Sequence, residues 1–325
     1  MGQGTFWCHR CGNRNPAGSQ ACQRCGARLR PPKALHKETK KGVRLASREG
    51  APPPSVSTTR FAAEEPLPLD TIICGDCLEI LPRWPSESID LVITSPPYNF
   101  GLDAYDAHRD TQDWATYFAT LGTAFRECAR LLKPGGRICV VVQPLFSDYM
   151  PTHHRVARLL EEAGLLFYGE ILWEKHNYNA KYTAWGSWRS PSMPYLKYTW
   201  EFIEVFAKGS RRKPGRRDAI DITAEEFKAW VTARWEIPPE TRMKGFGHPS
   251  MFPERLVERL VKLFSYRGDV VLDPFNGAGT TTLVAYRLGR HFIGIDVSER
   301  YCQVARARLA QVAQAPNTGA PLVVK

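Results

Sequence analysis

The 325-residue sequence predicts an α/β protein built on a doubly wound, mostly parallel β-sheet. Between residues 67 and 314, short runs of β-branched residues alternate with longer amphipathic stretches, a pattern typical of strands joined by helical crossovers. One run, Val270–Asp273, leads into a glycine-rich loop that opens a helix, as in nucleotide-binding proteins of this class. The length suits one large domain and a small additional module.

Seven strands are expected in this sheet, at Thr71–Cys74, Ile89–Thr94, Arg137–Gln143, Tyr168–Trp173, Glu201–Ala207, Val270–Asp273 and His291–Asp296. The helices are expected at Trp114–Leu132, Thr152–Ala163, Pro253–Tyr266, Gly279–Leu288 and Glu299–Gln311. Pro134-Gly135-Gly136 should stop the first of these helices, because proline lacks the N–H that a helix needs and glycine favours a turn.

Composition narrows the partners and the compartment. The chain has 44 Lys and Arg against 33 Asp and Glu, a net charge of +11 that favours a nucleic acid partner, with a merely soluble basic surface as the alternative. No apolar run approaches the roughly 20 residues that span a bilayer, so no membrane contact is expected. The N-terminus lacks the apolar stretch of a secretory signal, which predicts a cytoplasmic protein.

Residues 1–27 are predicted to form a zinc ribbon. Two Cys-x2-Cys pairs, separated by ten residues, have the spacing that lets four thiolates converge on one structural zinc: Cys8, Cys11, Cys22 and Cys25. Such a short segment cannot fold on apolar burial alone, so the metal should supply much of its stability. Contact with DNA and binding of another protein both stay open as its role.

Three further segments complete the predicted organisation. Residues 28–66 are basic and rich in proline, which predicts a flexible linker, and residues 315–325 form a tail. At about 177–247 the alternation weakens and Trp, Tyr, Arg and Lys accumulate, so a DNA-recognition insertion is expected there. Basic residues around a Pro-Gly turn in this insertion are expected to bind DNA phosphates, a solvated loop being the alternative: Arg211, Arg212, Lys213, Arg216 and Arg217.

The glycine-rich loop at 273–281 favours S-adenosyl-L-methionine as cofactor. It carries neither the lysine of a P-loop nor the GxGxxG pattern of a dehydrogenase. Asp273 at the end of the strand would repel a pyrophosphate but would pair with an ammonium group, which S-adenosyl-L-methionine carries. Asp296 follows 23 residues later, a spacing that suits a carboxylate on ribose hydroxyls.

A second motif, Thr94-Ser95-Pro96-Pro97-Tyr98-Asn99, fits methylation of an exocyclic amine on a base. The prolines fix the backbone, so Ser95 and the Pro96 carbonyl can accept the two amino hydrogens and aim the nitrogen lone pair at a methyl group. Tyr98 offers a flat face against which a flipped-out base could stack.

These residues resemble the β-class DNA amino-methyltransferases of restriction–modification systems, in which the amine motif precedes the cofactor loop. TSPPYN at 94–99 and DPFNGAGTT at 273–281 match the two main motifs of that family. Gly75-Asp76, Trp173-Glu174-Lys175 and His248-Pro249-Ser250 match secondary ones. The resemblance covers about residues 67–309 and implies an S-adenosyl-L-methionine-dependent methyltransferase fold at 67–314, to which the zinc ribbon is added.

The resemblance also implies which residues form the site. Ser95, Pro96, Pro97 and Tyr98 would act at the target amine. The cofactor residues would be Asp76, Pro249, Ser250, Asp273, Phe275, Asn276, Gly277, Gly279, Thr280, Thr281 and Asp296. Of these, Asp273 and the Gly277–Thr281 turn would hold the methionine part, Asp296 the ribose, and Asp76 would lie near the adenine.

In this family serine at the first position of the amine motif is commoner in cytosine-N4 enzymes, so Ser95 favours cytosine N4, with adenine N6 as the alternative. A protein or RNA N-methyltransferase is a remoter alternative, because those place the cofactor loop first. Methylation of cytosine C5 is disfavoured because no cysteine follows a proline. The expected partners are double-stranded DNA, a cognate restriction endonuclease acting on the same site, and a second copy of the chain in a homodimer.

Overall fold

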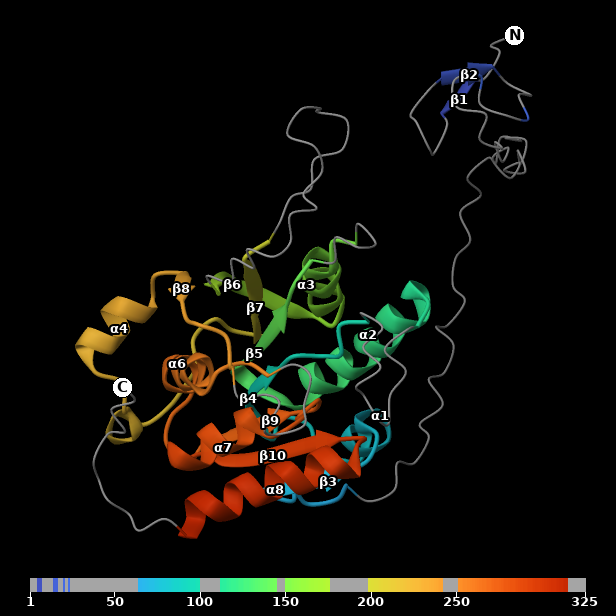
Figure 1. Ribbon diagram of the computed structural model, residues 1–325. Coiled ribbons are helices and arrows are strands. Elements are labelled where there is room, and N and C mark those ends of the chain that lie inside the picture. Colours follow the sequence, from blue (N-terminus) through green and yellow to red (C-terminus); the bar gives the residue numbers. More distant parts are fainter. Residues whose placement is uncertain are drawn as a thin grey trace, which may run out of the picture. The chain divides into compact units, whose positions relative to one another are not determined.

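The computed structural model describes residues 64–99, 112–144, 150–175, 198–241 and 251–314, with short pieces of the N-terminal segment at 5–7, 14–16, 20 and 23. The chain divides into two units, residues 1–59 and residues 60–325, and the two are described separately (Figure 1). Among the described helices, none has the length and apolarity needed to cross a bilayer.

In the N-terminal unit, β1 (Thr5–Trp7) pairs antiparallel with β2 (Arg14–Pro16). The four cysteines of the predicted zinc ribbon lie outside the described residues: Cys8, Cys11, Cys22 and Cys25. Within the described residues, no group of three or more His, Cys, Asp or Glu side chains is placed to hold a metal ion. The zinc site therefore stays a prediction.

The larger unit is built on an eight-stranded sheet. In spatial order its strands are β3 (Thr71–Cys74), β10 (His291–Asp296), β9 (Val270–Asp273), β4 (Ile89–Thr94), β5 (Leu132–Val142), β7 (Trp200–Lys208), β6 (Leu165–Glu174) and β8 (Arg234–Glu236). Among these strands β7 alone runs antiparallel to the rest, so the sheet is mixed but mostly parallel, as predicted.

The predicted number of seven strands is wrong by one. The eighth strand, β8, has only three residues and two of them are charged, so it lacks the apolar run by which strands are recognised in a sequence. Pro134-Gly135-Gly136 also differs from its prediction in one respect. The helix before it ends at Leu131 as expected, but the turn residues themselves belong to the start of β5.

Helices cover both faces of the sheet (Figure 1). One face packs against α1 (Cys77–Ile80), α2 (Trp114–Leu131) and α3 (Thr152–Glu162). The other packs against α6 (Glu254–Phe264), α7 (Thr280–Arg287) and α8 (Glu299–Gln314). The five predicted helices are confirmed to within three residues at each end, whereas α1, the 3-10 helices η1 (Leu81–Arg83) and η2 (Arg217–Ala219), and α4 (Ala224–Trp230) had not been expected.

The order of the strands decides where a ligand can bind. β4 and β9 are neighbours although they lie far apart in the sequence, and Leu91 and Val92 pair with Val271 and Leu272. Both strands point the same way, so their carboxyl ends meet at one edge of the sheet, which is where open α/β sheets bind ligands. We call this edge the carboxyl edge and the opposite one the amino edge.

Candidate active site

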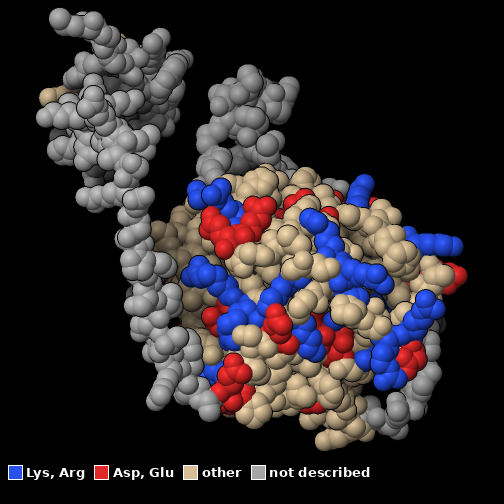
Figure 2. Space-filling view, turned by 180° about the vertical axis from the view of Figure 1, so that it is seen from behind, with Lys and Arg blue, Asp and Glu red and all other residues tan. Residues whose placement is uncertain are grey.

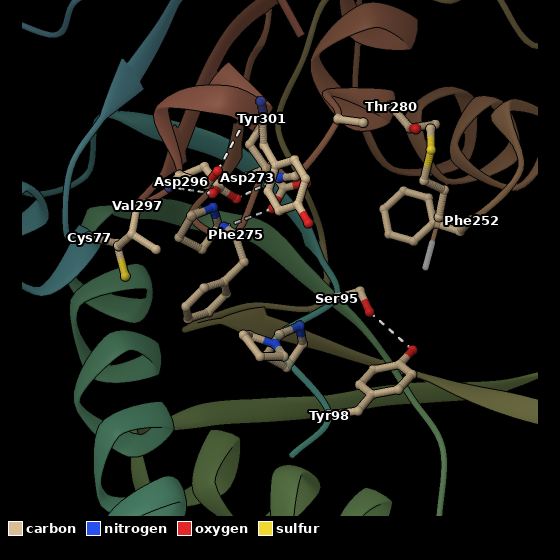
Figure 3. A pocket seen from close by; sticks show the side chains of 18 of the residues that line it. Cys77, Ser95, Tyr98, Phe252, Asp273, Phe275, Thr280, Asp296, Val297 and Tyr301 are labelled. Atoms are coloured by element: carbon tan, nitrogen blue, oxygen red, sulfur yellow. Dashed lines mark hydrogen bonds between the residues drawn. The ribbon is translucent and has the colours of Figure 1, made fainter. Parts of the chain in front are cut away.

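A cavity of about 430 Å³ opens at the carboxyl edge, within the size range of small-molecule sites. It is lined by most of the residues predicted from the two motifs: Asp76, Ser95, Pro96, Pro97, Tyr98, Asp273, Phe275, Asn276, Gly277, Thr280 and Asp296. Figure 3 shows Ser95 and Tyr98 on one side of this cavity and Asp273 and Asp296 on the other. The two motifs therefore share one site.

The glycine-rich loop needs its glycines for backbone reasons. Gly277 and Gly279 have φ angles of +48° and +79°, a region that other residues rarely adopt. A Cβ at Gly279 would lie only 2.6 Å from Cβ of Ala305 on α8. Gly279 and Thr281 do not line the cavity. Gly279 can act on a cofactor only through the shape of the loop, whereas the fully buried Thr281 also hydrogen-bonds to the Asp273 carboxyl, which favours its ionised form.

Asp273 is a buried carboxyl group at the end of β9, with 1% of its surface exposed. Its Oδ1 accepts hydrogen bonds from Thr94 Oγ1 at 2.7 Å and from the Phe275 N–H at 3.1 Å. Burial raises its pKa from 3.8 to about 6, because the charged form loses its hydration. A cation in the cavity would stabilise the ionised form, so the site favours a positively charged group here.

Asn276 supplies the complementary donor. Its Oδ1 accepts from Thr282 Oγ1 at 3.1 Å, while its buried Nδ2 has no hydrogen-bond partner among the described residues. Gly294 makes room for this side chain, since a Cβ there would lie 2.5 Å from Cγ of Asn276. A buried N–H group without a partner is costly, so this donor fits an acceptor, such as a carboxylate, from a ligand.

Two further carboxylates are held in place by backbone N–H groups. Asp296 ends β10 and accepts from Gly277 N–H at 2.8 Å and from Ser298 N–H at 2.9 Å. Asp76 caps α1 and accepts from Leu78 N–H at 2.8 Å. These bonds fix the direction of each carboxylate at the rim of the cavity. Both positions suit the hydroxyl and amino groups of a nucleoside.

The amine motif is continued by groups from other strands. Ser95 Oγ lies 3.0 Å from Tyr98 Oη, and Tyr98 Oη lies 3.1 Å from Oε2 of Glu201, the second residue of β7 (Figure 3 shows the first contact). The other oxygen of Glu201 forms an ion pair with Lys175, which directly follows β6. The Pro97 carbonyl accepts from Tyr117 Oη at 2.7 Å, which ties the motif to α2.

Sequence reasoning missed Glu201 as a site residue, and it gave Lys175 no role. Both line the cavity, as do Trp173, Phe252 and Tyr301. Glu201 left a signal that could have been used, because a charged residue within a strand as apolar as 201–207 requires a partner when it is buried. Which partner it has depends on the pairing of distant strands, which the sequence does not reveal.

Pro249 and Ser250 are outside the described residues. The basic loop at 211–217 follows the end of antiparallel β7 and therefore lies at the amino edge, across the sheet from the cavity. There Arg137 donates to the Arg211 carbonyl at 2.9 Å, and Arg211 Nε donates to the Phe167 carbonyl at 2.9 Å.

Lys213 requires a correction. Its side chain is 8% exposed, and its Nζ lies 2.8 Å from Asp90 and 3.2 Å from Asp269. A lysine neutralised by two carboxylates and shielded from solvent cannot offer its charge to a DNA phosphate. Burial works against ionisation of Asp90, but hydrogen bonds from Lys133 and Lys213 lower its pKa, so this cluster is an internal ion network.

Comparison with known structures finds DNA methyltransferases of the same fold. TTHA0409 of Thermus thermophilus, a proposed DNA modification methylase solved with S-adenosyl-L-methionine, is 32% identical, with a TM-score of 0.61 over 76% of this chain and 95% of its own. PvuII DNA methyltransferase (cytosine-N4-specific) shares the fold at 22% identity, with a TM-score of 0.57 over 73% of this chain and 85% of its own.

Comparison by sequence finds type II methyltransferases. M.MjaVI of Methanocaldococcus jannaschii is 35% identical over 53% of this chain and 87% of its own. M.HpaI of Haemophilus parainfluenzae is 30% identical over 73% of both chains. The DNA methylase family N6_N4_Mtase matches residues 89–307, which include both motifs. The chain therefore belongs to this family of N6/N4 DNA methyltransferases.

Proposed function

We propose that the protein is a site-specific DNA methyltransferase that transfers a methyl group from S-adenosyl-L-methionine to the exocyclic N4 amine of a flipped-out cytosine. One observation carries the proposal. The amine motif at the end of β4 and the glycine-rich loop at the end of β9 line one cavity, and Thr94 bonds directly to Asp273 across 179 positions of sequence. An amine and a cofactor bound by the two motifs would therefore be neighbours.

The donor set fits the cofactor. Asp273 suits its ammonium group, the Nδ2 donor of Asn276 its carboxylate, and Asp296 its ribose hydroxyls, with Asp76 near the adenine. S-adenosyl-L-methionine supplies a methyl group that its sulfonium already activates. The 32% identical TTHA0409, which was crystallised with this molecule, supports the assignment. Thr280 and Phe275 would line the pocket, and Pro249 and Ser250 would close it.

The residues of the chain act on the amine by orientation. Ser95 and the Pro96 carbonyl accept the two amino hydrogens, which draws the nitrogen toward a tetrahedral geometry and aims its lone pair into the cavity. The ring of Tyr98 stacks against the base after it has left the duplex. Pro97 holds this arrangement rigid, because its carbonyl is tied to Tyr117.

The choice of cytosine N4 over adenine N6 depends on Ser95. Both amines need the same acceptors, so adenine N6 is the alternative substrate, and the fold shared with PvuII methyltransferase does not bear on the choice. The type II relatives support a role in a restriction–modification system, with a cytoplasmic location and a cognate endonuclease that cuts the same site. We also propose that two copies of the chain form a homodimer.

DNA recognition is assigned to the first part of the predicted insertion. Residues 176–197 join Lys175, which lines the cavity after the carboxyl end of β6, to Tyr198, just before the start of β7. On the face shown in Figure 2, Lys and Arg are interspersed with Asp and Glu and form no single basic stripe. A duplex centred on the carboxyl edge would bring its flipped base to Ser95.

The zinc ribbon is proposed as an accessory module. The proposal rests on the spacing of the four cysteines, the first two of which lie in the sequence between the paired strands β1 and β2. Mass spectrometry of the intact chain should find one zinc ion per molecule. Complete absence of zinc would show that these residues do not form a zinc ribbon. Deleting residues 1–59 should leave binding of the cofactor unchanged, because the larger unit has its own core.

Expression in a host without DNA methylation, followed by modification-sensitive sequencing of its DNA, tests the proposal. We expect N4-methylcytosine at one short sequence motif, and a much smaller methylated fraction of that motif in a matched culture that expresses Ser95→Ala. N6-methyladenine at a motif would show that the substrate is the alternative, adenine N6, and not cytosine N4. Unmodified DNA in both cultures, with folded protein present, would contradict the proposed function.

A further inference from the structure

The three hydroxyl and carboxyl groups behind the target amine form a chain whose direction is forced. Glu201 is 3% exposed and paired with Lys175, so it is a carboxylate, and a carboxylate can only accept. Tyr98 must therefore donate its single hydrogen to Glu201. The Tyr98 oxygen has no second hydrogen to donate, so in its contact with Ser95 it is the acceptor, and the single hydroxyl hydrogen of Ser95 points at Tyr98. What Ser95 presents to the cavity is lone pairs alone.

This direction has a chemical consequence at the substrate. A serine hydroxyl that is free to rotate can point its hydrogen at a base amine, which would repel the amino hydrogens. The carboxylate, acting through Tyr98, removes that orientation and makes a neutral hydroxyl behave as an acceptor only. Charged acceptors also strengthen the hydrogen bonds that lead to them, because a chain of hydrogen bonds polarises its members.

We propose that Glu201 is a positioning residue that, through Tyr98, holds the Ser95 hydroxyl as an acceptor toward the substrate amine and receives the proton that methylation releases. The inference depends on the proposed function, since it needs an amine in the cavity. Lys175 orients Glu201 and keeps its second oxygen occupied.

The proton balance closes within the site. The amine nitrogen uses its lone pair to bond the methyl carbon, and the electron pair of the broken carbon–sulfur bond stays on sulfur. The nitrogen is then cationic and gives a proton to Ser95 Oγ as the serine hydrogen moves to Tyr98 Oη and the tyrosine hydrogen moves to Glu201. The products are a neutral methylated amine and a protonated Glu201, which returns its proton to solvent between turnovers.

Glu201→Gln tests the direction of the chain. Lys175 is a donor only, so it would hold the amide oxygen of the glutamine and leave the NH2 group facing Tyr98. The chain would then reverse, and Ser95 would point its hydrogen at the substrate amine. We expect kcat to fall about 100-fold, the effect of losing one preorganised polar group, with the KM for DNA and the affinity for S-adenosyl-L-methionine within twofold of wild type.

Glu204→Gln is the matched control. Glu204 lies three residues along the same strand, is 1% exposed, and faces Glu170 and not the cavity. Burial and the neighbouring Glu170 carboxyl raise its pKa, so a neutral amide resembles its protonated form. This variant should keep the kcat of wild type, which would show that loss of a buried carboxylate from β7 does not by itself stop methyl transfer.

Tyr98→Phe separates the relay from a structural role of Glu201. The phenylalanine keeps the ring for stacking and leaves the Glu201–Lys175 pair in place, but it removes the link. Its kcat should fall about as far as that of Glu201→Gln, and the double variant should be no slower than either single variant, because both interrupt one chain.

The outcomes separate the two claims. The rates are measured as transfer of the methyl group from S-adenosyl-L-methionine to DNA. If the wild-type protein transfers no methyl group to a DNA amine, the proposed function fails before any variant is compared. If wild type is active but Tyr98→Phe keeps its kcat, the relay is overturned, whether or not Glu201→Gln folds. The relay is equally overturned if Glu201→Gln is fully active, or if the two losses multiply in the double variant to about 10,000-fold.

Discussion

The two edges of the central sheet both carry buried charge, but they use it differently. At the amino edge Asp90 is satisfied on all sides, by Lys133, Lys213 and the Val270 N–H. At the carboxyl edge Asp273 is buried with a raised pKa and without a described cation beside it, and the Nδ2 donor of Asn276 has no described partner. Buried charges whose hydrogen bonds and ion pairs are made within the protein stabilise the fold. Buried polar groups that lack such partners and lie next to a cavity indicate a ligand.

The largest expected effect is on stability, from Lys213→Met at the amino edge. It leaves Asp90 and Asp269 buried with less compensation, which should lower the free energy of unfolding by about 3 to 5 kcal/mol. Lys133→Met, which removes a half-exposed partner of the same Asp90, should cost less than about 1 kcal/mol. Urea titrations of both variants measure this. Loss of cofactor affinity in folded Lys213→Met would contradict the separation of the two edges.

Ser95→Ala should have the next largest effect, on catalysis alone. Removing the acceptor at the carboxyl end of β4 should lower kcat by about 100- to 1,000-fold, because orientation of the amine is lost. Ser88→Ala removes a hydroxyl at the amino end of the same strand, where Ser88 Oγ donates to the Pro85 carbonyl at 2.6 Å. Its kcat should match wild type, and steady-state rates of methyl transfer provide the comparison.

Asp273→Asn should lower affinity for S-adenosyl-L-methionine by about 10- to 100-fold, the effect of one charged hydrogen bond. The pH dependence is more specific. In the folded protein Asp273 binds its proton more tightly than in the unfolded chain, so its contribution to stability falls as pH rises from about 4 to about 6. Cofactor affinity should rise through the same range, because only the carboxylate pairs with an ammonium group.

Calorimetric titrations and thermal melts of wild type and Asp273→Asn at several pH values measure both trends. The difference between the two proteins isolates Asp273 from other carboxyl groups. A cofactor affinity of wild type that stays flat through pH 6, or falls, would mean that Asp273 does not meet the ammonium group.

The smallest effect is expected from replacing Arg211, Arg212, Arg216 and Arg217 together by alanine. Each phosphate contact adds about 0.9 to the slope of log affinity against log salt concentration. The loop lies at the amino edge, and Arg216 pairs with Asp218. The slope should therefore change by less than about 0.9, the contribution of one phosphate contact. A decrease in this slope equal to about two phosphate contacts or more would show that these arginines bind phosphates, as the sequence alone suggests.

The difference between the edges also explains what the sequence could predict. Local patterns predicted the strands, the long helices and the two motifs, since glycine and proline mark the turns in DPFNGAGTT and TSPPYN. Lys213 and Glu201 were misjudged or missed because their surroundings come from other strands. Lys213 resembles its neighbouring arginines in the sequence. The pairing of β7 with β5, and of β5 with β4, brings the loop after β7 beside Asp90.

We propose that the cavity at the carboxyl edge methylates a cytosine amine in DNA. The most direct measurement uses purified protein, duplex DNA and S-adenosyl-L-methionine labelled in its methyl group, followed by digestion of the DNA to nucleosides and mass spectrometry. We expect the label in N4-methylcytosine, and expect it to enter about 100- to 1,000-fold more slowly with Ser95→Ala. Label in N6-methyladenine would overturn the choice of base, and label in 5-methylcytosine or in no nucleoside at all would contradict the claim itself.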